Sequence, residues 1–500
     1  MANETSLTGT STPIPLANGY SISAPGVIGT AEKVEKPTGT RSAMRINPND
    51  PLPPNLLAMA GADVAAHFEI TIDAVIPPPP AATGTRGAQS VQTGQPASAI
   101  EFAAPKPAPN TRSIVLHTDE NGELSWIWPG KVDEEKAYFY LPRESATPPP
   151  ETGTRSRGAV IATMRRVVKL ITWATDDIIG DMALHFAQNW EEKNRPYGFH
   201  YVQPGQFGGE VPWGRLGEGR SLLLLHGTFS TGDSAFSGLI YSDWLKKMAE
   251  YYGGRIFAFN HPSLHHSPEE NIREFRKMLP NEVKNLELDI VTHSRGGLVG
   301  RELCERFSGA DGEDKRVQVK RAVLVAGPNS GTILTDRQHW SSLIDSYTNL
   351  LVGLPDNVFT ITLEGILTLI KVVGGGAVHG LPGLQAMLPG GDYVKMLNQA
   401  PKPDGDYFAL AAQYLPNDEQ GAAHLKKTML VKALRAIFGE DSDMVVPTQG
   451  CYALNPEVAG FTIPQERYKV YGAADDTHHL NFFEKDKVNR QLHDWLTTAN

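Results

Sequence analysis

The sequence has little cysteine, no long apolar run and no excess of basic charge. Cys304 and Cys451 are the only cysteines among 500 residues, so a disulfide framework is excluded and no Cys/His spacing indicates a zinc site. The stretch most similar to a long apolar run is residues 361–388. Charged residues, Gly and Pro interrupt it, so none of its uninterrupted apolar runs reaches the ~18 residues of a transmembrane helix. A net charge of -10 argues against a nucleic-acid partner.

The first residues also lack the basic start and apolar core of a secretory signal peptide, so we expect a cytoplasmic protein. Hydrophobic residues make up 40% and charged residues 20% of the chain, which is typical of globular proteins and not of disordered or fibrous ones. Because single domains usually span about 100 to 200 residues, a length of 500 predicts two or three folded units.

Proline is concentrated near the N-terminus, where residues 1–150 contain 21 of the 37 prolines. Runs such as 77–80 and 148–150 favour polyproline II and cannot join a sheet ladder, so they predict stiff spacers. The first 150 residues therefore differ in kind from the remainder of the chain.

Strand-like stretches occur between these spacers. Residues 67–75 alternate apolar and polar side chains, and residues 113–117 lead through Asn121-Gly122 into a second strand-like run. Asn-Gly between two such runs predicts a β-hairpin. The expected organisation is a low-complexity segment over 1–59, a small β module over 60–146 and a linker over 147–157.

Thr-Gly-Thr-Arg occurs three times, ending at Arg41, Arg86 and Arg155. A recurring loop composition is one explanation. The alternative is a set of exposed sites for an Arg-specific partner protease, because nicking concentrates in flexible loops of small residues. Cleavage at these sites would leave residues 156–500 intact, and the N-terminal half would then be a removable restraint.

The pattern changes from residue 158 onwards. Residues 160–192 carry apolar side chains at helical spacing and predict one or two helices. Continuously apolar strands that alternate with helices are typical of a mostly parallel sheet covered on both faces. We therefore expect a doubly wound α/β domain over 158–500, with an insertion over 332–406. Its predicted strands are 221–225, 255–259, 288–292, 321–326, 407–412 and 467–471.

Ser294 follows the predicted strand 288–292 and precedes a predicted helix. A serine on such a tight turn is held in a strained conformation with its Oγ above the sheet edge, and its neighbours must be small. Gly296 meets this need on one side, whereas Thr292 stands where the pattern usually has glycine. The alternative is a serine that merely caps a helix.

Other residues at strand ends could complete a catalytic set. Gly227 lets the chain turn after the strand 221–225, so that an amide can face an oxyanion, with the amide of Arg295 as partner donor. Residues 440–447 offer an acid on a loop, and residues 477–483 offer a histidine. The order serine, acid, histidine is the one that strand–turn–helix serine enzymes use.

Residues 218–498 resemble the α/β-hydrolase superfamily of the lipase and esterase type. The resemblance is carried by the motifs HGTF, THSRGG, VLVAGPNSGT, DMVVP and HHLNFF. It implies Ser294 as nucleophile, Asp443 as orienting acid and His479 as general base, with the amides of Thr228 and Arg295 as the oxyanion hole. It further implies a serine esterase that hydrolyses small-molecule or lipid esters and needs no cofactor or metal.

Two of these assignments have a neighbouring competitor. His478 adjoins His479, and the family pattern, a histidine directly before x-Asn-aromatic-aromatic, favours His479. Asp441 competes with Asp443, and the D-x-V-V-P arrangement favours Asp443. The side chains of Arg295 and Arg301 are expected on a helix surface or at the rim of the substrate site, and His261, His265 and His266 in a polar loop at that rim, with metal binding as the alternative.

The insertion contains the apolar run 361–370 and the glycine-rich segment 373–377. A hinged lid over an acyl-chain pocket is one interpretation, and helical packing on the core is the other. A lid favours lipid or long-chain esters, with peripheral lipid contact. The alternative function is a catalytically inert α/β-hydrolase-fold interaction module, but a complete Ser/Asp/His set favours the enzyme.

Overall fold

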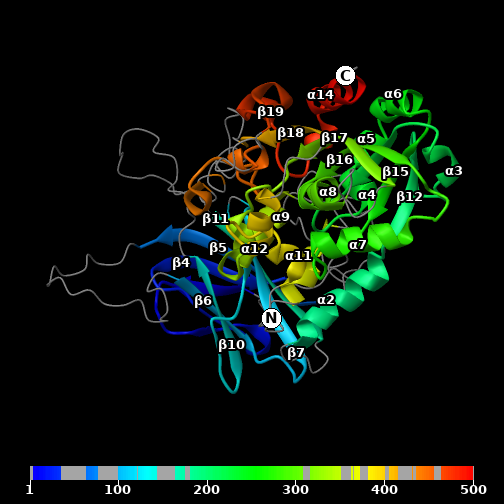
Figure 1. Ribbon diagram of the computed structural model, residues 1–500. Coiled ribbons are helices and arrows are strands. Elements are labelled where there is room, and N and C mark those ends of the chain that lie inside the picture. The colour runs from blue at the N-terminus through cyan, green and yellow to red at the C-terminus, as the bar shows by residue number, and fades with distance from the viewer. Residues whose placement is uncertain are drawn as a thin grey trace. The chain divides into compact units, whose positions relative to one another are not determined.

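The structure, a computed structural model, shows two compact units (Figure 1). The described residues up to 174 form the first unit and those from 181 form the second. None of the helices within the described ranges combines the length and hydropathy needed to cross a bilayer. The described residues are 4–34, 63–76, 99–120, 122–142, 164–174, 181–307, 316–350, 362–363, 365–371, 381–399, 405–414, 431, 435–454 and 463–498.

The first unit consists of two antiparallel sheets. One has the strand order β1-β4-β5-β11-β7-β8 and the other β2-β3-β6-β10-β9. Burial alternates along β5, as it does where one face of a strand meets a core. The strands are β1 (Glu4–Thr8), β2 (Ile14–Pro15), β3 (Ser21–Ser23), β4 (Val27–Lys33), β5 (Asp63–Val75), β6 (Ala99–Pro105), β7 (Thr111–Thr118), β8 (Leu124–Ile127), β9 (Lys131–Val132), β10 (Lys136–Pro142) and β11 (Met164–Ala174).

Aromatic side chains fill the centre of this unit. Phe68 of one sheet packs edge-on against Phe102 of the other, with ring centroids 5.4 Å apart. Tyr20 and Phe139 add further ring contacts to the same group. The buried side chains thus join both sheets into one core, as in a β-sandwich. Strand β7 pairs antiparallel with β8, as the hairpin signal predicts.

Strand β11 corrects the helical prediction for residues 160–192. Its residues pair antiparallel with both β5 and β7, and among the described residues of that stretch only those of α2 (Asp181–Asn194) are helical. Val, Ile, Thr and Trp give β11 a composition that fits a half-buried sheet better than a helix. Strands β1 to β4 also lie within the range predicted to be of low complexity. The units therefore divide near residue 177, and the predicted boundary at 158 is wrong.

The proline runs and the three Thr-Gly-Thr-Arg repeats lie outside the described residues, as does the glycine-rich segment of the insertion.

The second unit is built on an eight-stranded sheet with the order β13-β12-β15-β14-β16-β17-β18-β19. The strands from β15 to β19 in this order run parallel, whereas β12 and β13 are antiparallel. All six apolar runs form strands here, which confirms the α/β prediction. The strands are β12 (Gly198–Gln203), β13 (Gln206–Phe207), β14 (Ser221–Leu225), β15 (Ile256–Asn260), β16 (Leu286–His293), β17 (Val317–Val325), β18 (Asp406–Ala412) and β19 (Tyr468–Tyr471).

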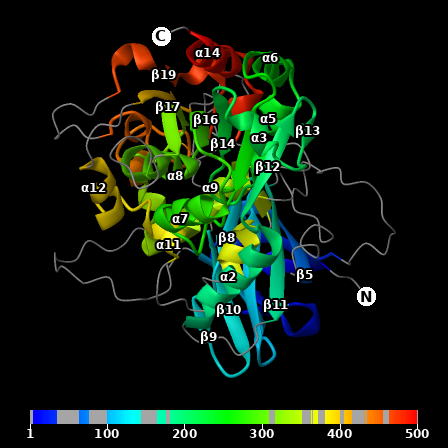
Figure 2. The same ribbon diagram turned by 45° about the vertical axis from the view of Figure 1, so that its right-hand side comes forward.

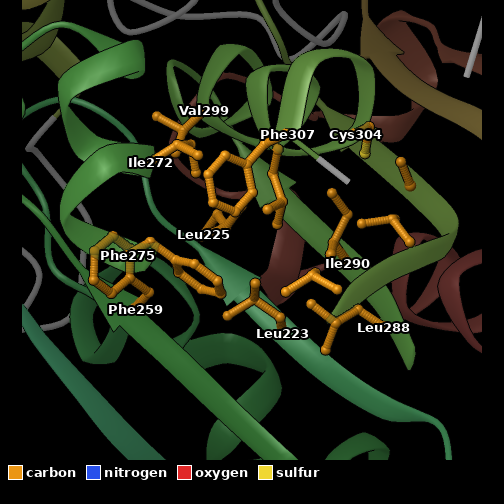
Figure 3. Close-up of a cluster of buried hydrophobic side chains, with 14 of the residues drawn as sticks. Leu223, Leu225, Phe259, Ile272, Phe275, Leu288, Ile290, Val299, Cys304 and Phe307 are labelled. Atoms are coloured by element: carbon orange, nitrogen blue, oxygen red, sulfur yellow. The ribbon is translucent and has the colours of Figure 1, made fainter. Parts of the chain in front are cut away.

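Helices cover both faces of this sheet. On one face Leu223 packs in a cluster with Phe275 and Val299 (Figure 3). On the other face Leu222, its neighbour in β14, shares a cluster with Met248. Successive strand residues point to opposite faces, so a strand buried on both must be apolar throughout. The helices are α3 (Trp213–Leu216), α4 (Gly232–Ala235), α5 (Ser237–Ile240), α6 (Asp243–Tyr251), α7 (Pro268–Met278), α8 (Gly296–Glu302), α9 (Trp340–Leu350), α11 (Pro382–Gln385), α12 (Asp392–Asn398) and α14 (Asp486–Thr497).

Parallel strands bring their carboxyl ends to one edge of the sheet, where α/β proteins place their sites. Thr228, Ser294, Asp443 and His479 follow β14, β16, β18 and β19, respectively. Figure 2 shows β14, β16 and β17 side by side in the second unit.

Candidate active site

Ser294 lies on a sharp turn between β16 and α8. Its φ is 54°, in the left-handed region that non-glycine residues rarely adopt. Its amide donates to the carbonyl of Val325, at 2.9 Å, which fixes the turn against β17. A side chain at Gly296 would collide with the carbonyl oxygens of Leu225 and His226. The local strain and the close helix–strand approach are those expected of a nucleophile turn.

Thr292 takes the place usually held by glycine two residues before the serine, and α8 makes room for it. A Cβ added at Gly300 would lie 2.7 Å from Cγ2 of Thr292, and one at Gly297 would lie 3.6 Å from its Oγ1. Thr292 is fully buried. Glycines on the helix α8, instead of a glycine on the strand β16, therefore permit the close packing of helix and strand, and the turn geometry is kept.

His479 joins Ser294 to Asp443 through two hydrogen bonds. Its Nε2 lies 2.8 Å from Oγ of Ser294, and its Nδ1 lies 2.7 Å from Oδ2 of Asp443. The other carboxylate oxygen of Asp443 accepts the amides of Val445 and Val446. Because an ionised carboxylate only accepts, Nδ1 carries the proton and Nε2 can accept the serine proton. The arrangement can activate a serine hydroxyl.

The main chain around His479 is held from two sides. Its amide donates to the carbonyl of Asp443 at 3.0 Å, and its carbonyl accepts Nε2–H of His293 at 2.8 Å. Burial, with a smaller effect of the charge on His479, lowers the pKa of His293 to about 3. His293 is therefore a neutral donor. No local pattern marks this role of His293, because the carbonyl that it meets is 186 residues away in the sequence.

The two competitors that the sequence left open lie outside this chain of hydrogen bonds. Nδ1 of His478 accepts the amide of Leu480, at 3.3 Å. Asp441 accepts a 2.6 Å hydrogen bond from Gln413 and pairs with Arg435 at 3.3 Å. The structure thus brings His479 and Asp443, rather than their neighbours, to the serine.

The turn after β14 lies directly on the serine. A Cβ added at Gly227 would be 2.6 Å from Cβ of Ser294, so only glycine fits there. The Oγ1 atom of Thr228 is buried and has no hydrogen-bond partner among the described residues. Phe229 has a φ of 59° and donates its amide to Oγ of Ser263, at 3.4 Å. The turn therefore contacts the nucleophile through Gly227, which directly precedes Thr228, and Arg295 directly follows the nucleophile.

Tyr347, on α9 of the insertion, is a site residue that the sequence did not identify. Its ring stands edge-on to His479, with centroids 5.9 Å apart, and edge-on to Phe229, at 5.0 Å. A Cβ added at Gly365 would lie 2.8 Å from Cβ of Phe229. Ser294 is only 2% exposed. The described parts of the insertion thus pack onto the site. The lid interpretation of the insertion is the only expectation from the sequence that anticipates such a contact.

The side chains of Arg295 and Arg301 are fully buried, so their expected place on a helix surface or substrate rim is wrong. Arg295 donates to the carbonyls of Gly383 and His266 and to Oδ1 of Asn271. Burial lowers the pKa of Arg295 to about 10. Arg301 forms an ion pair with Glu305 at 2.6 Å. Sequence cannot reveal such burial, because the acceptors of Arg295 come from distant segments.

The loop after β15 is held by Glu191 of α2. This carboxylate accepts the amides of Ser263, Leu264 and His265 and a 2.6 Å hydrogen bond from Nδ1 of His265. Glu191 is fully buried, and His265 is 6% exposed. The expectation of a polar rim is therefore wrong for His261 and His265, which are buried. His266 is half-buried, and its Nδ1 lies 2.5 Å from the hydroxyl of Tyr197.

His261 is fully buried, and its ring stacks on His226 with centroids 4.2 Å apart. Within the described ranges, no three His, Cys, Asp or Glu residues are grouped to hold a metal ion.

The family described as Domain of unknown function (DUF7379) matches residues 193–497, more than half of the chain. The chain belongs to the DUF7379 family. The DUF7379 domain includes all strands of the eight-stranded sheet together with Ser294, Asp443 and His479. No curated protein matches the sequence.

Several solved structures are similar to the chain at low identity. Lipase 1 from Pelosinus fermentans is 14% identical, with a TM-score of 0.39, over 56% of this chain and 99% of that one. Phospholipase PlaB from Legionella pneumophila is 16% identical, with a TM-score of 0.32, over 47% of this chain and 45% of that one. A metagenomic carboxyl esterase is 18% identical, with a TM-score of 0.30, over 53% and 65%. The chain thus resembles solved structures described as lipases, esterases and an α/β hydrolase family protein.

Proposed function

We propose that the protein is a serine hydrolase that cleaves carboxylic ester bonds. The observation that carries this proposal is the continuous hydrogen-bonded chain from Oγ of Ser294 through His479 to Asp443. The three side chains come from separate strand ends and are almost fully buried, so the chain is not a chance surface contact. A strained nucleophile turn with an imidazole at hydrogen-bond distance is the arrangement that acyl transfer needs.

In the proposed mechanism, Nε2 of His479 takes the Ser294 proton as Oγ attacks the acyl carbon. Asp443 stabilises the imidazolium that forms, and the amides of Thr228 and Arg295 donate to the oxyanion. His479 then gives the proton to the leaving alcohol, which leaves an acyl-enzyme. Water repeats the two steps, releases the carboxylic acid and restores Ser294.

Lipid esters are the substrates we propose within this class. The insertion packs on Phe229 through the ring of Tyr347 and the backbone at Gly365, and an acyl chain would be compatible with such surroundings. Because Ser294 is 2% exposed, the insertion has to move to admit a substrate, as a lid does, and peripheral lipid contact would favour that movement. The buried apolar residues among the described part of the run 361–370 are Leu363, Ile366, Leu367, Leu369 and Ile370.

The proposal is tested with p-nitrophenyl esters of short and long acyl chains and with a fluorophosphonate probe. Wild-type protein is expected to hydrolyse the esters and to bind the probe covalently, and Ser294→Ala to keep its fold and lose both reactions. A rate that rises with acyl length supports the lipid proposal. Probe labelling that persists in Ser294→Ala would move the nucleophile elsewhere. Absence of any labelling of the wild type would favour a non-catalytic interaction module.

We also propose that the N-terminal half restrains the enzyme until an Arg-specific protease cuts after Arg41, Arg86 or Arg155. Limited digestion with trypsin should then yield a fragment that starts near Ser156, and release of the N-terminal pieces from this fragment should raise the ester hydrolysis rate. A digest without that fragment, or a released fragment with unchanged activity, would remove the idea.

A further inference from the structure

The phenol of Tyr347 meets the reacting hydroxyl group. The side chain of Ser294 lies within hydrogen-bonding reach of the phenol, and the aromatic ring contacts both His479 and Phe229. Phe229 directly follows Thr228, whose amide is proposed to bind the oxyanion. Tyr347 therefore reaches Ser294 between the base and the turn after β14.

The position of this phenol is fixed by α9. Trp340, at the start of the helix, donates its Nε1–H to the carbonyl of Thr335 at 3.0 Å. Leu343 and Ile344, which precede Tyr347 on α9, are buried, and Tyr347 itself is 2% exposed. A polar group that is held rigidly and away from water is effective against charge that develops beside it.

The direction of the hydrogen bond follows from proton counting. The single proton of the Ser294 hydroxyl is used in the contact with Nε2 of His479. Oγ of Ser294 can then only accept from Tyr347. Burial raises the pKa of Tyr347, because desolvation disfavours the phenolate. The phenol therefore keeps its proton at neutral pH and acts as a donor.

We propose that the Tyr347 phenol is a third oxyanion donor, beside the amides of Thr228 and Arg295. The inference rests on the proposed hydrolase function. When Oγ attacks, one of its lone pairs forms the new C–O bond, and negative charge develops on the carbonyl oxygen of the same carbon. That oxygen becomes the stronger acceptor, and the phenol O–H turns to it. No proton leaves Tyr347, and the hydrogen bond returns to Oγ when the acyl group departs.

The test is Tyr347→Phe, which keeps both ring contacts and removes only the hydroxyl. With p-nitrophenyl butyrate we expect kcat to fall about 100-fold, the usual effect of losing one oxyanion donor. KM should stay within about threefold, because the contact strengthens only in the transition state. The inhibition constant of a trifluoromethyl ketone, which forms a tetrahedral adduct with serine, should rise by a factor similar to the loss in kcat.

Tyr252→Phe is the matched control. Its buried phenol donates to Oδ2 of Asp289, at 2.7 Å, in the middle of β16. It should leave kcat unchanged. A variant with 3-fluorotyrosine at position 347 covers the case in which Tyr347→Phe fails to fold. This more acidic donor of similar shape should hydrolyse the ester at least as fast as wild type. A slower 3-fluorotyrosine variant, or an unchanged or raised kcat in Tyr347→Phe, would overturn the inference.

The two proposals fail in different ways. Hydrolysis that depends on Ser294 but survives Tyr347→Phe with an unchanged inhibition constant removes only the role of the phenol. Wild-type protein without any hydrolysis that depends on Ser294 overturns the hydrolase function and the inference with it.

Discussion

Glu191 on α2 accepts a 2.6 Å hydrogen bond from Nδ1 of His265, on the loop that follows β15. Burial by itself raises the pKa of Glu191, but the hydrogen bonds and charge of His265 and the amide of Ser263 outweigh it, and the pKa is lowered. A carboxylate with a lowered folded-state pKa stabilises the fold above its ordinary pKa of 4.5. That contribution is lost as the pH falls through the folded-state value.

Glu191→Gln should lower the free energy of unfolding by about 1–3 kcal/mol near pH 7, because the amide NH₂ group would face main-chain N–H donors. It should also weaken the dependence of stability on pH below about 4.5. Urea unfolding at neutral and acidic pH measures both effects. Glu192→Gln, an exposed neighbour on the same helix, is the control. Equal losses of unfolding free energy in the two variants would contradict the proposal that Glu191 stabilises the loop after β15.

Asp443→Asn should reduce kcat by about 10³- to 10⁴-fold, because the amide no longer fixes the His479 tautomer that accepts the serine proton. The matched control is Asp441→Asn, two residues away and bound to Gln413 and Arg435. It should leave kcat nearly unchanged. Initial rates with a p-nitrophenyl ester distinguish the two, and a larger loss in the control would assign the acid to Asp441.

Gly365→Ala should destabilise the fold by about 1–3 kcal/mol through overpacking. The added Cβ would lie 2.8 Å from Phe229, and this collision should exceed the gain in helix propensity. Gly214→Ala, in α3, adds a Cβ with no atom within 4 Å and should be neutral or stabilising. Thermal unfolding measures both variants. A higher unfolding midpoint for Gly365→Ala would contradict the prediction, because it would show that Phe229 or the backbone shifts at little cost to admit the added Cβ.

His293 should make the fold sensitive to mild acid. Its pKa of about 3 lies below the ordinary 6.5, so the unfolded chain binds a proton first. Stability is then lost as the pH falls below about 6.5, by roughly 1.4 kcal/mol per pH unit from this group. His293→Asn should remove that part of the slope between about pH 6 and pH 4. His493→Asn, a partly exposed histidine of α14, should keep it. Equal slopes in the two variants would exclude the effect.

The strands and the serine turn of the second unit could be predicted because their signals are local. Each strand is a continuous apolar run, and Ser294 is marked by the glycines next to it. Asp443 and His479 could be placed because each follows a strand whose carboxyl end meets the same sheet edge. Choosing them over Asp441 and His478 needed the family pattern.

The remaining features depend on partners far away in the sequence. β11 has the spacing of a helix and becomes a strand because β5 and β7 offer it two ladders. The burial of Arg295 follows from acceptors on other segments, and the carboxylate of Glu191 meets amides more than 70 residues later. Tyr347 carries no local sign of its role, because its neighbours His479 and Phe229 belong to other strand ends.

The central place of β11 in its sheet bears on any cut after Arg155. β11 lies downstream of that bond, yet both of its ladder partners, β5 and β7, lie upstream. The pieces of a nicked chain would stay associated through two rows of main-chain hydrogen bonds. They would elute together from a size-exclusion column and separate only in denaturant. Shedding the N-terminal piece thus takes an extraction of β11 as well as a protease.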